Sequence, residues 1–167
     1  DPNMMVGRQR SKNSVTLYKD PNKPMFIRRI QAEYPPGSIF KVINALVSQQ
    51  FGQAKPDTRY FCAGGYRFGR RGLMRCTHVH GSVDLAQSIQ YSCNTYYGYV
   101  YNRMIDHSGL RPVNAFKKWR EAVAKFNIGS KLDIDFPNEK KGLLPTDELY
   151  TKRWKSDRWG SSFNISL

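Results

Sequence analysis

YPPGSIFKVINALVSQQFG, from Tyr34 to Gly52, places one lysine inside an otherwise apolar helical pattern. The Pro-Pro-Gly corner blocks a helix before Ser38 and Gly52 ends the pattern, so the spacing predicts a helix over 38–50. Because this helix is apolar nearly all round, we expect it to lie in the interior of the protein. Lys41 would then be buried, which is unfavourable for an ammonium group unless a partner or a lowered pKa relieves it.

The spacing of Lys41 to Ser38 suggests a role for the lysine. Residues three apart on a helix lie on one face, so the two side chains would stand side by side. A serine hydroxyl is a poor nucleophile until a base takes its proton, and a desolvated lysine can be that base. Ser-x-x-Lys also arises by chance in a chain of this length, and Lys41 could instead extend to a surface carboxylate. Its place after Pro-Pro-Gly favours the catalytic interpretation.

A nucleophile–lysine site also needs a second polar element across its cleft. Ser92-Cys93-Asn94 fits, because it falls between two helical patterns, where a connecting turn would present the serine and the asparagine. The same Ser-x-Asn pattern occurs at 11–13 and 162–164, so it is weak by itself. Only its combination with Ser38 and Lys41 is informative.

The rest of the chain predicts a mixed α and β protein in which helices dominate. Ser82 and Asp84 indicate the start of a helix. Apolar residues recur at helical spacing over 96–104 and 112–126. Elsewhere we expect loops and short extended pieces over 1–37, a loop or small hairpin over 53–80, a short strand at 131–137 (KLDIDFP) and a loop over 137–145.

Composition sets the class of the protein without naming a partner. The chain has 167 residues, 40% apolar and 13% aromatic, which is enough for one domain with a core. No run of ~18 apolar residues occurs, so the sequence predicts no membrane-spanning helix. The net charge of +14 indicates either a solvated basic surface or attraction to a polyanion. No zinc-finger, bZIP or RNP signature accompanies it.

Three cysteines and one histidine have the types and number of a closed zinc site: Cys62, Cys76, His80 and Cys93. Cys76 and His80 are close enough in sequence to reach one ion, whereas the other two must arrive through folding. The alternative is a Cys62–Cys76 disulfide with Cys93 as a free buried thiol, and the spacing leaves both open. His78 is a weaker ligand candidate, and His107 is expected at the surface.

YPPGSIFK, followed some fifty residues later by SCNTYYGYVYN, resembles the transpeptidase domain of class B penicillin-binding proteins, most of all the elongation-type penicillin-binding protein 2. DPN at the start and LDIDFPNEKKGLLP near the end resemble further stretches, so the likeness covers nearly the whole chain. By this resemblance Ser38 is the acylated nucleophile, Lys41 its base, and Ser92 and Asn94 the proton relay and substrate anchor.

The resemblance implies a β-lactamase/penicillin-binding-protein transpeptidase-like fold, mixed α and β, with its helical part dominant here. The family's Lys-Thr-Gly motif does not occur, and KKG at 140–142 lies where the family has a loop. We therefore expect residues 1–167 to be a partial transpeptidase domain. It would lack much of the family's antiparallel sheet with the Lys-Thr-Gly region, and also the N-terminal membrane anchor and pedestal. Such a fragment is expected to be inactive alone.

The implied activity is that of a peptidoglycan D,D-transpeptidase, which cross-links stem peptides through a serine acyl-enzyme during cell-wall elongation. The implied partners are stem peptides, β-lactam antibiotics and membrane proteins of the elongation machinery, at the periplasmic face of the bacterial inner membrane. The family's metal site in this region favours a structural Zn²⁺ on the Cys/His set over the disulfide.

Two other functions stay open at the level of sequence. A serine β-lactamase or β-lactam sensor shares the nucleophile and the lysine, but a lactamase needs a dedicated base for deacylation, and no carboxylate is marked for that role. A basic nucleic-acid-binding module with a Cys/His zinc would explain the charge. We expect no nucleic-acid partner.

Overall fold

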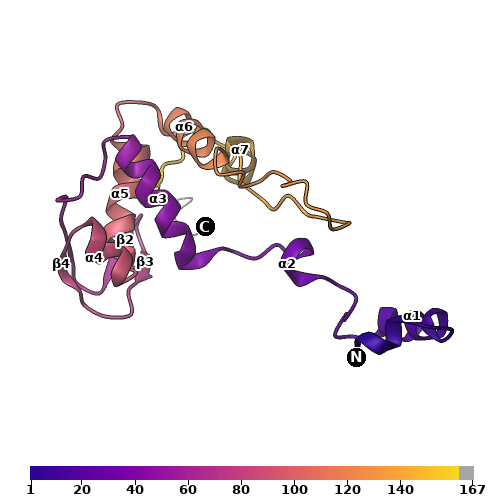
Figure 1. Cartoon of the computed structure of the whole chain (residues 1–167). Coiled ribbons are helices and arrows are strands. Elements are labelled where there is room, and N and C mark those ends of the chain that lie inside the picture. The colour runs from indigo at the N-terminus through magenta and orange to yellow at the C-terminus, as the bar shows by residue number, and fades with distance from the viewer. Residues whose placement is uncertain (162–167) are drawn as a thin grey trace. The chain divides into compact units, whose positions relative to one another are not determined.

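The computed structural model describes residues 1–161, so the Ser-x-Asn pattern at 162–164 lies outside it (Figure 1). The chain forms two compact units. The first consists of Asp1–Tyr34 with Lys131–Gly142, and the second of Pro35–Ser130 with the segment that begins at Leu143. No helix among the described residues is long and apolar enough to cross a membrane. All the candidate site residues belong to the second unit.

The first unit contains helices where loops were expected, so that prediction is wrong. It holds a 3₁₀ turn, η1 (Pro2–Met5), and two α-helices, α1 (Arg10–Lys19) and α2 (Arg28–Gln31). None of the α1 residues is buried. Local bonds hold these elements instead: Asn13 Nδ2 donates to the Met4 carbonyl at 2.9 Å. Apolar periodicity therefore gave no signal for α1.

The strand expected at 131–137 is also absent from the described structure. Asp133 has a φ of 54°, a left-handed conformation that interrupts an extended run. The backbone N–H groups of Leu132 and Asp133 donate to the Glu139 carboxylate at 2.8 and 3.1 Å. A strand needs a partner strand for its backbone groups, and here a side chain takes that place.

The second unit has the predicted helices and one that the spacing did not indicate. The 3₁₀ turn η2 (Gly37–Ile39) leads directly into α3 (Phe40–Gln50). The other helices are α4 (Leu85–Gln90), α5 (Asn94–Asp106), α6 (Pro112–Ala124) and α7 (Asp147–Trp154). Asp84 caps α4 with a reciprocal capping box, as its sequence suggested. The unpredicted helix, α7, has a local signal of its own, because Thr146 caps it and two acidic residues occupy its first turn.

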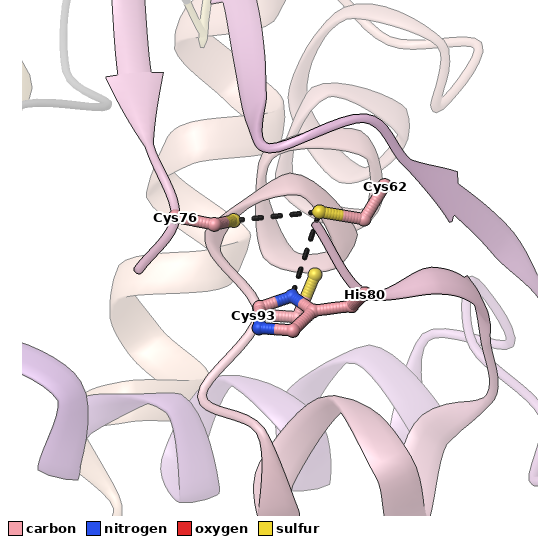
Figure 2. A group of neighbouring side chains, drawn as sticks. All are labelled: Cys62, Cys76, His80 and Cys93. Carbon is pink, nitrogen blue, oxygen red and sulfur yellow. Dashed lines mark hydrogen bonds between the residues drawn. The ribbon is translucent and has the colours of Figure 1, made fainter. Parts of the chain in front are cut away.

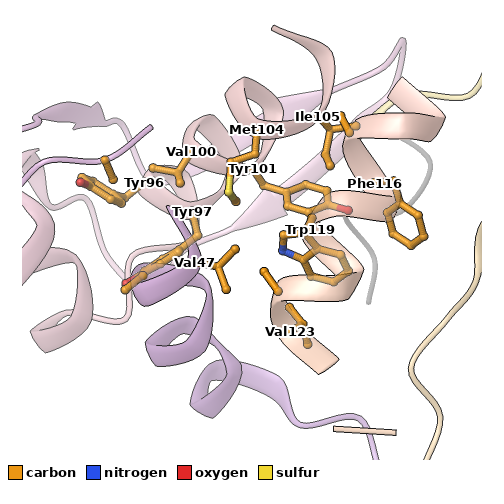
Figure 3. Close-up of a cluster of buried hydrophobic side chains, with 14 of the residues drawn as sticks. Val47, Tyr96, Tyr97, Val100, Tyr101, Met104, Ile105, Phe116, Trp119 and Val123 are labelled. Carbon is orange, nitrogen blue, oxygen red and sulfur yellow. The ribbon is translucent and has the colours of Figure 1, made fainter. Parts of the chain in front are cut away.

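The core of this unit surrounds α5, which contacts α3, α4, α6 and the strands (Figure 3). Val100 and Ile105 on α5, with Phe116 on α6, are completely buried. Trp119 packs edge-on against Tyr101, with ring centroids 5.5 Å apart. These apolar contacts hold α5 in the middle of the unit and so determine where its N-terminus lies.

The helix that carries Lys41 is only partly interior, so the expectation of a buried helix is wrong for one face of α3. Ala45 and Val47 are buried, whereas Val42 and Leu46 are 48% and 49% exposed. The helix packs on α5 and α6 through one side. Its opposite apolar side stays exposed in the described part of the chain.

Two antiparallel pairs confirm a hairpin region between α3 and α4. β1 (Tyr60–Cys62) pairs with β4 (Gly81–Val83), and β2 (Gly65–Phe68) pairs with β3 (Gly72–Arg75). Opposite residues share a face, so the register places Tyr66 and Met74 together. Tyr66 packs directly on Gly98, where a Cβ would lie 2.4 Å from its ring. Gly98 thus lets β2 approach α5.

We predict that Gly98→Ala destabilises the protein. Alanine favours a helix over glycine by about 1 kcal/mol, but here the added methyl overlaps the buried Tyr66 ring. Such overlap costs about 1–3 kcal/mol, so the free energy of unfolding, measured by urea denaturation, should decrease. In a Tyr66→Ala background the same glycine substitution should lose this penalty. An equal penalty in both backgrounds would contradict the packing explanation.

Candidate active site

Ser38 lies at the point where the chain turns into α3. Gly37 has a φ of 60°, which glycine adopts without strain. The two prolines before it restrict the backbone that leads into this corner. Ser38 occupies the middle of η2 and is exposed to solvent. A rigid corner therefore presents its hydroxyl one turn before Lys41.

Lys41 joins two segments that lie far apart in sequence. Its Nζ lies 2.9 Å from Ser38 Oγ, 2.9 Å from Ser92 Oγ and 3.0 Å from the Ser92 carbonyl oxygen. An ammonium group donates a hydrogen to each of these three atoms. A neutral amine has two hydrogens and one lone pair, so it can accept from Ser38 and still donate to both atoms of Ser92. The contacts are compatible with either charge state.

The surroundings of Lys41 favour the neutral amine more than water does. Burial lowers the pKa of Lys41 below its ordinary value of 10.5, and negative charge on Cys76 and Cys93 opposes that shift. The sequence suggested that Lys41 is enclosed in the core, but its side chain is only half-buried. Lys41 lines the same cleft as Ser38, so its amine is partly removed from water beside the exposed serine.

Ser92 reaches Lys41 because its backbone is left-handed, with a φ of 51°. This conformation costs a non-glycine residue about 1–2 kcal/mol and must be held by its surroundings. Ser92 lies in the tight turn between α4 and α5, where its N–H donates to the Ile89 carbonyl at 3.1 Å. The turn aims both the carbonyl and the hydroxyl of Ser92 at Lys41.

Asn94 begins α5 and is oriented by the neighbouring hairpin. Its Nδ2 donates to the Arg75 carbonyl on β3 at 2.6 Å. With the amide nitrogen held in this way, Oδ1 is the acceptor left for a ligand. Asn94 and Met74 line a cleft of about 230 Å³ together with Ser38 and Lys41. The structure therefore brings all four predicted residues of the catalytic set to one place, Ser92 through its contacts with Lys41.

The four predicted metal ligands also converge (Figure 2). One ligand atom from each of Cys62, Cys76, His80 and Cys93 lies within 4.8 Å of the others. Cys62 Sγ is 3.6 Å from Cys76 Sγ and 3.5 Å from His80 Nδ1. All three cysteines are free thiols. His78 and His107 are exposed and lie outside the cluster.

These separations fit a tetrahedral zinc shell. With Zn–S near 2.3 Å and Zn–N near 2.0–2.1 Å, the edges of a tetrahedron are about 3.8 Å between sulfurs and about 3.6 Å between sulfur and nitrogen. The measured 3.6 and 3.5 Å agree with both edges. The same 3.6 Å is far longer than a disulfide bond of about 2.05 Å. Soft ligands of this kind and number suit Zn²⁺.

The thiols of the cluster differ in acidity. Burial raises the pKa of Cys62, but hydrogen bonds, first among them one with Thr95, outweigh burial and lower it to about 6. For Cys93 burial dominates and raises the pKa to about 12. Because the thiolate is the metal-binding form, the hydrogen bonds that lower the pKa of Cys62 also favour its binding to an ion.

Comparison with known proteins identifies the family of the chain. The profile of the penicillin binding protein transpeptidase domain matches residues 3–165. The chain belongs to this transpeptidase family.

Curated relatives of this transpeptidase chain share one name. Peptidoglycan D,D-transpeptidase MrdA of Acinetobacter baumannii is 28% identical over 174 residues, which cover 100% of this chain and 24% of that protein. MrdA of Escherichia coli K12 is 30% identical over 159 residues, which cover 93% of this chain and 23% of that protein. The chain thus spans about a quarter of the length of these relatives.

Solved structures of PBP2 are similar to this transpeptidase chain. The crystal structure of Pseudomonas aeruginosa PBP2 in complex with WCK 5153 has a TM-score of 0.77 and 25% identity, and the match covers 100% of this chain and 36% of that one. PBP2 of Helicobacter pylori in complex with MreC has a TM-score of 0.78 and 22% identity, over 98% of this chain and 29% of that one. These matches confirm the resemblance to penicillin-binding protein 2 and the mixed, helix-dominated fold.

Some residues of the transpeptidase site had no signal in the sequence. Met74, Asn44 and Trp119 line the cleft but belong to no recognisable motif. Asn44 accepts a hydrogen bond from Trp119 Nε1 at 2.9 Å, which links the cleft to the core. Thr95 contacts Cys76 at 3.5 Å, and only its position directly after Asn94 could have drawn attention to it.

We predict that Lys41 titrates below 10.5, because its charged form is partly desolvated. NMR titration of protein labelled with ¹³C at lysine Cε would measure this, with Lys41→Arg used to assign the Lys41 resonance. As pH rises, this resonance should shift at a lower pH in the folded protein than in the same protein unfolded in urea. A midpoint that stays the same on unfolding would show that burial has no effect on Lys41.

Proposed function

We propose that the protein is a serine-type peptidoglycan D,D-transpeptidase, for which this chain supplies the nucleophile side of the active site. One observation carries the proposal: a single lysine nitrogen lies within 3.0 Å of both Ser38 Oγ and Ser92 Oγ. Proton transfer between a nucleophile and a leaving group needs such a bridge.

In the acylation step, neutral Lys41 accepts the Ser38 proton while Ser38 Oγ attacks the carbonyl carbon of the penultimate D-alanine. The tetrahedral intermediate collapses when the C–N bond breaks. The leaving D-alanine nitrogen takes a proton that passes from Lys41 through Ser92 Oγ, which lies 2.9 Å from Nζ. Ser38 is then an ester, and Lys41 is neutral again.

The second half of the reaction runs these transfers in reverse. An amine from a neighbouring stem peptide attacks the ester carbonyl and gives up a proton toward Ser92 and Lys41. Ser38 Oγ leaves and recovers its proton from Lys41, and a new amide bond joins the two stems. Asn94 supports both halves, because its Oδ1 can hold a backbone N–H of the substrate.

The lining of the cleft supports a transpeptidase more than a β-lactamase. A lactamase needs a general base for the deacylating water, and no Asp or Glu of residues 1–161 lines this cleft. The match to the transpeptidase family supports this function over the nucleic-acid-binding alternative.

The thiol cluster supports a structural zinc ion as part of this proposal. The ion would be held by Cys62, Cys76, His80 and Cys93. A shell filled by four protein ligands ties these segments of the chain together and leaves no open position on the ion for catalysis. Cys93 lies directly between Ser92 and Asn94, so the ion would tether the turn that both site residues share. The sites of Lys41 and of the metal would then stabilise one another.

The cellular setting follows from the proposed reaction. Stem peptides are the substrates, and β-lactams, which mimic the D-Ala-D-Ala terminus, acylate the same serine. The setting is the periplasmic face of a bacterial inner membrane. Membrane proteins of the elongation machinery are the expected partners. The Helicobacter pylori PBP2 that resembles this chain forms a complex with MreC.

Labelled penicillin tests the assignment of the nucleophile in the complete protein. Ser38→Ala should abolish covalent labelling, and Lys41→Met should slow it about 10²–10⁴-fold through loss of the base. Ser11→Ala and Asn13→Ala, in the similar pattern at 11–13, serve as matched controls and should label normally. Undiminished labelling of the Ser38 variant would place the nucleophile elsewhere.

Metal analysis tests the zinc proposal. Protein purified without chelator should contain one zinc per chain and three thiols that titrate after denaturation. Cys62→Ser should lose the metal and lower the melting temperature, because two linked segments separate. His78→Ala, an exposed histidine outside the cluster, should keep it. One titratable thiol and no metal would instead establish the Cys62–Cys76 disulfide.

A further inference from the structure

The hairpin region beside the active site carries an unusual imbalance of charge. Residues 58–83, which include the strands β1 to β4, contain five arginines and no aspartate or glutamate. The β2–β3 hairpin within this segment holds four of the five, two on its strands and two in its turn: Arg67, Arg75, Arg70 and Arg71. We call these four residues the arginine hairpin.

The arginine hairpin is exposed and uncompensated. All four side chains are exposed, and none forms an ion pair with any residue of 1–161. The fifth arginine of the segment behaves differently, because Arg59 pairs with Asp84 at 2.8 Å just beyond the acid-free stretch. The fold therefore provides a carboxylate for Arg59 and leaves the hairpin without one.

The register gathers these charges on one side of the hairpin. Tyr66 and Met74 are opposite each other on the inner face, with Tyr66 packed on α5. Arg67 is paired with Leu73 and Arg75 with Gly65, so both arginines lie on the outer face. Arg70 and Arg71 occupy the turn between the strands.

The arginine hairpin is also physically continuous with the cleft. Met74 lines the cleft, and the Arg75 carbonyl accepts the hydrogen bond from Asn94. Arg71 is three residues from Met74, which is about 10 Å along an extended strand. A polymer that leaves the cleft over β3 would therefore pass close to these guanidinium groups.

We infer that the arginine hairpin binds carboxylate groups of the peptidoglycan strand whose stem peptide occupies the cleft. This inference rests on the proposed function and extends it to a second contact with the same substrate. Each stem that ends in D-Ala-D-Ala has a free carboxylate, so a strand that carries several stems is a polyanion. Guanidinium groups bind carboxylates through two parallel hydrogen bonds, and the hairpin offers four with no competing acid.

The inference concerns positioning rather than chemistry. The arginine side chains on the outer face do not line the cleft, so a small ligand that fills the cleft alone gains nothing from them. A strand with several stems should gain from them, and the gain should fall with salt because the contacts are exposed. Measurement of strand binding therefore reports on the arginine hairpin, whereas reaction with a small β-lactam reports on the nucleophile.

Cosedimentation of the complete protein with isolated peptidoglycan strands tests the inference. Arg67→Gln/Arg70→Gln/Arg71→Gln should weaken binding about five- to tenfold at ~0.05 M salt, with a smaller difference at ~1 M, where the Debye length is about 3 Å. The triple lysine replacement at these positions keeps the charges but loses the paired hydrogen bonds, so it should bind more weakly than the parent and more strongly than the glutamine triple. Lys55→Gln/Lys118→Gln/Lys125→Gln removes three exposed charges elsewhere on the same unit and should bind like the parent.

Three outcomes would overturn the inference. Unchanged strand binding of the glutamine triple would remove the hairpin from substrate recognition, and equal losses in the lysine-site control would reduce the effect to net charge. Binding to vesicles of anionic phospholipid that depends on the hairpin, without an effect on strands, would assign the surface to a membrane. Failure of the parent to react with labelled penicillin would count against the proposed function instead, because strand binding is measured separately.

Discussion

The site depends on one short turn in which consecutive residues point in different directions. The left-handed backbone of Ser92 sends its hydroxyl and carbonyl to Lys41. Cys93 then enters the thiol cluster, and Asn94 bonds to β3. Three consecutive residues thus connect the lysine, the candidate metal site and the hairpin. A left-handed non-glycine residue persists only where its surroundings hold it, and these contacts do so.

The chemistry of Lys41 follows from partial burial. Full burial would keep the amine neutral and give it no route to protonation, whereas full exposure would keep it charged. The half-buried position lowers the pKa of Lys41 without removing its three polar contacts. Because each contact can be satisfied in either charge state, a proton can move without rearrangement of the neighbouring groups.

Much of this arrangement was predictable from local sequence. Pro-Pro-Gly before Ser38, the Asp84 cap and the helical spacing of α3, α5 and α6 act through backbone constraint and periodic burial, which a short window records. The same reasoning failed for α1, which local hydrogen bonds hold without a buried face. It failed for 131–137 because alternation predicts which face is apolar and cannot supply a partner strand.

The sequence by itself determined the types of residue available: a serine and a lysine one helical turn apart, a Ser-x-Asn turn, and four soft metal ligands. Only the tertiary structure decided that Lys41 bridges Ser38 and Ser92, and that four ligands separated by up to 31 positions meet within 4.8 Å. The physical reason is that burial of α5 against α3, α6 and the strands fixes where its N-terminus lies. Distances between segments follow from that packing, and no local pattern contains them.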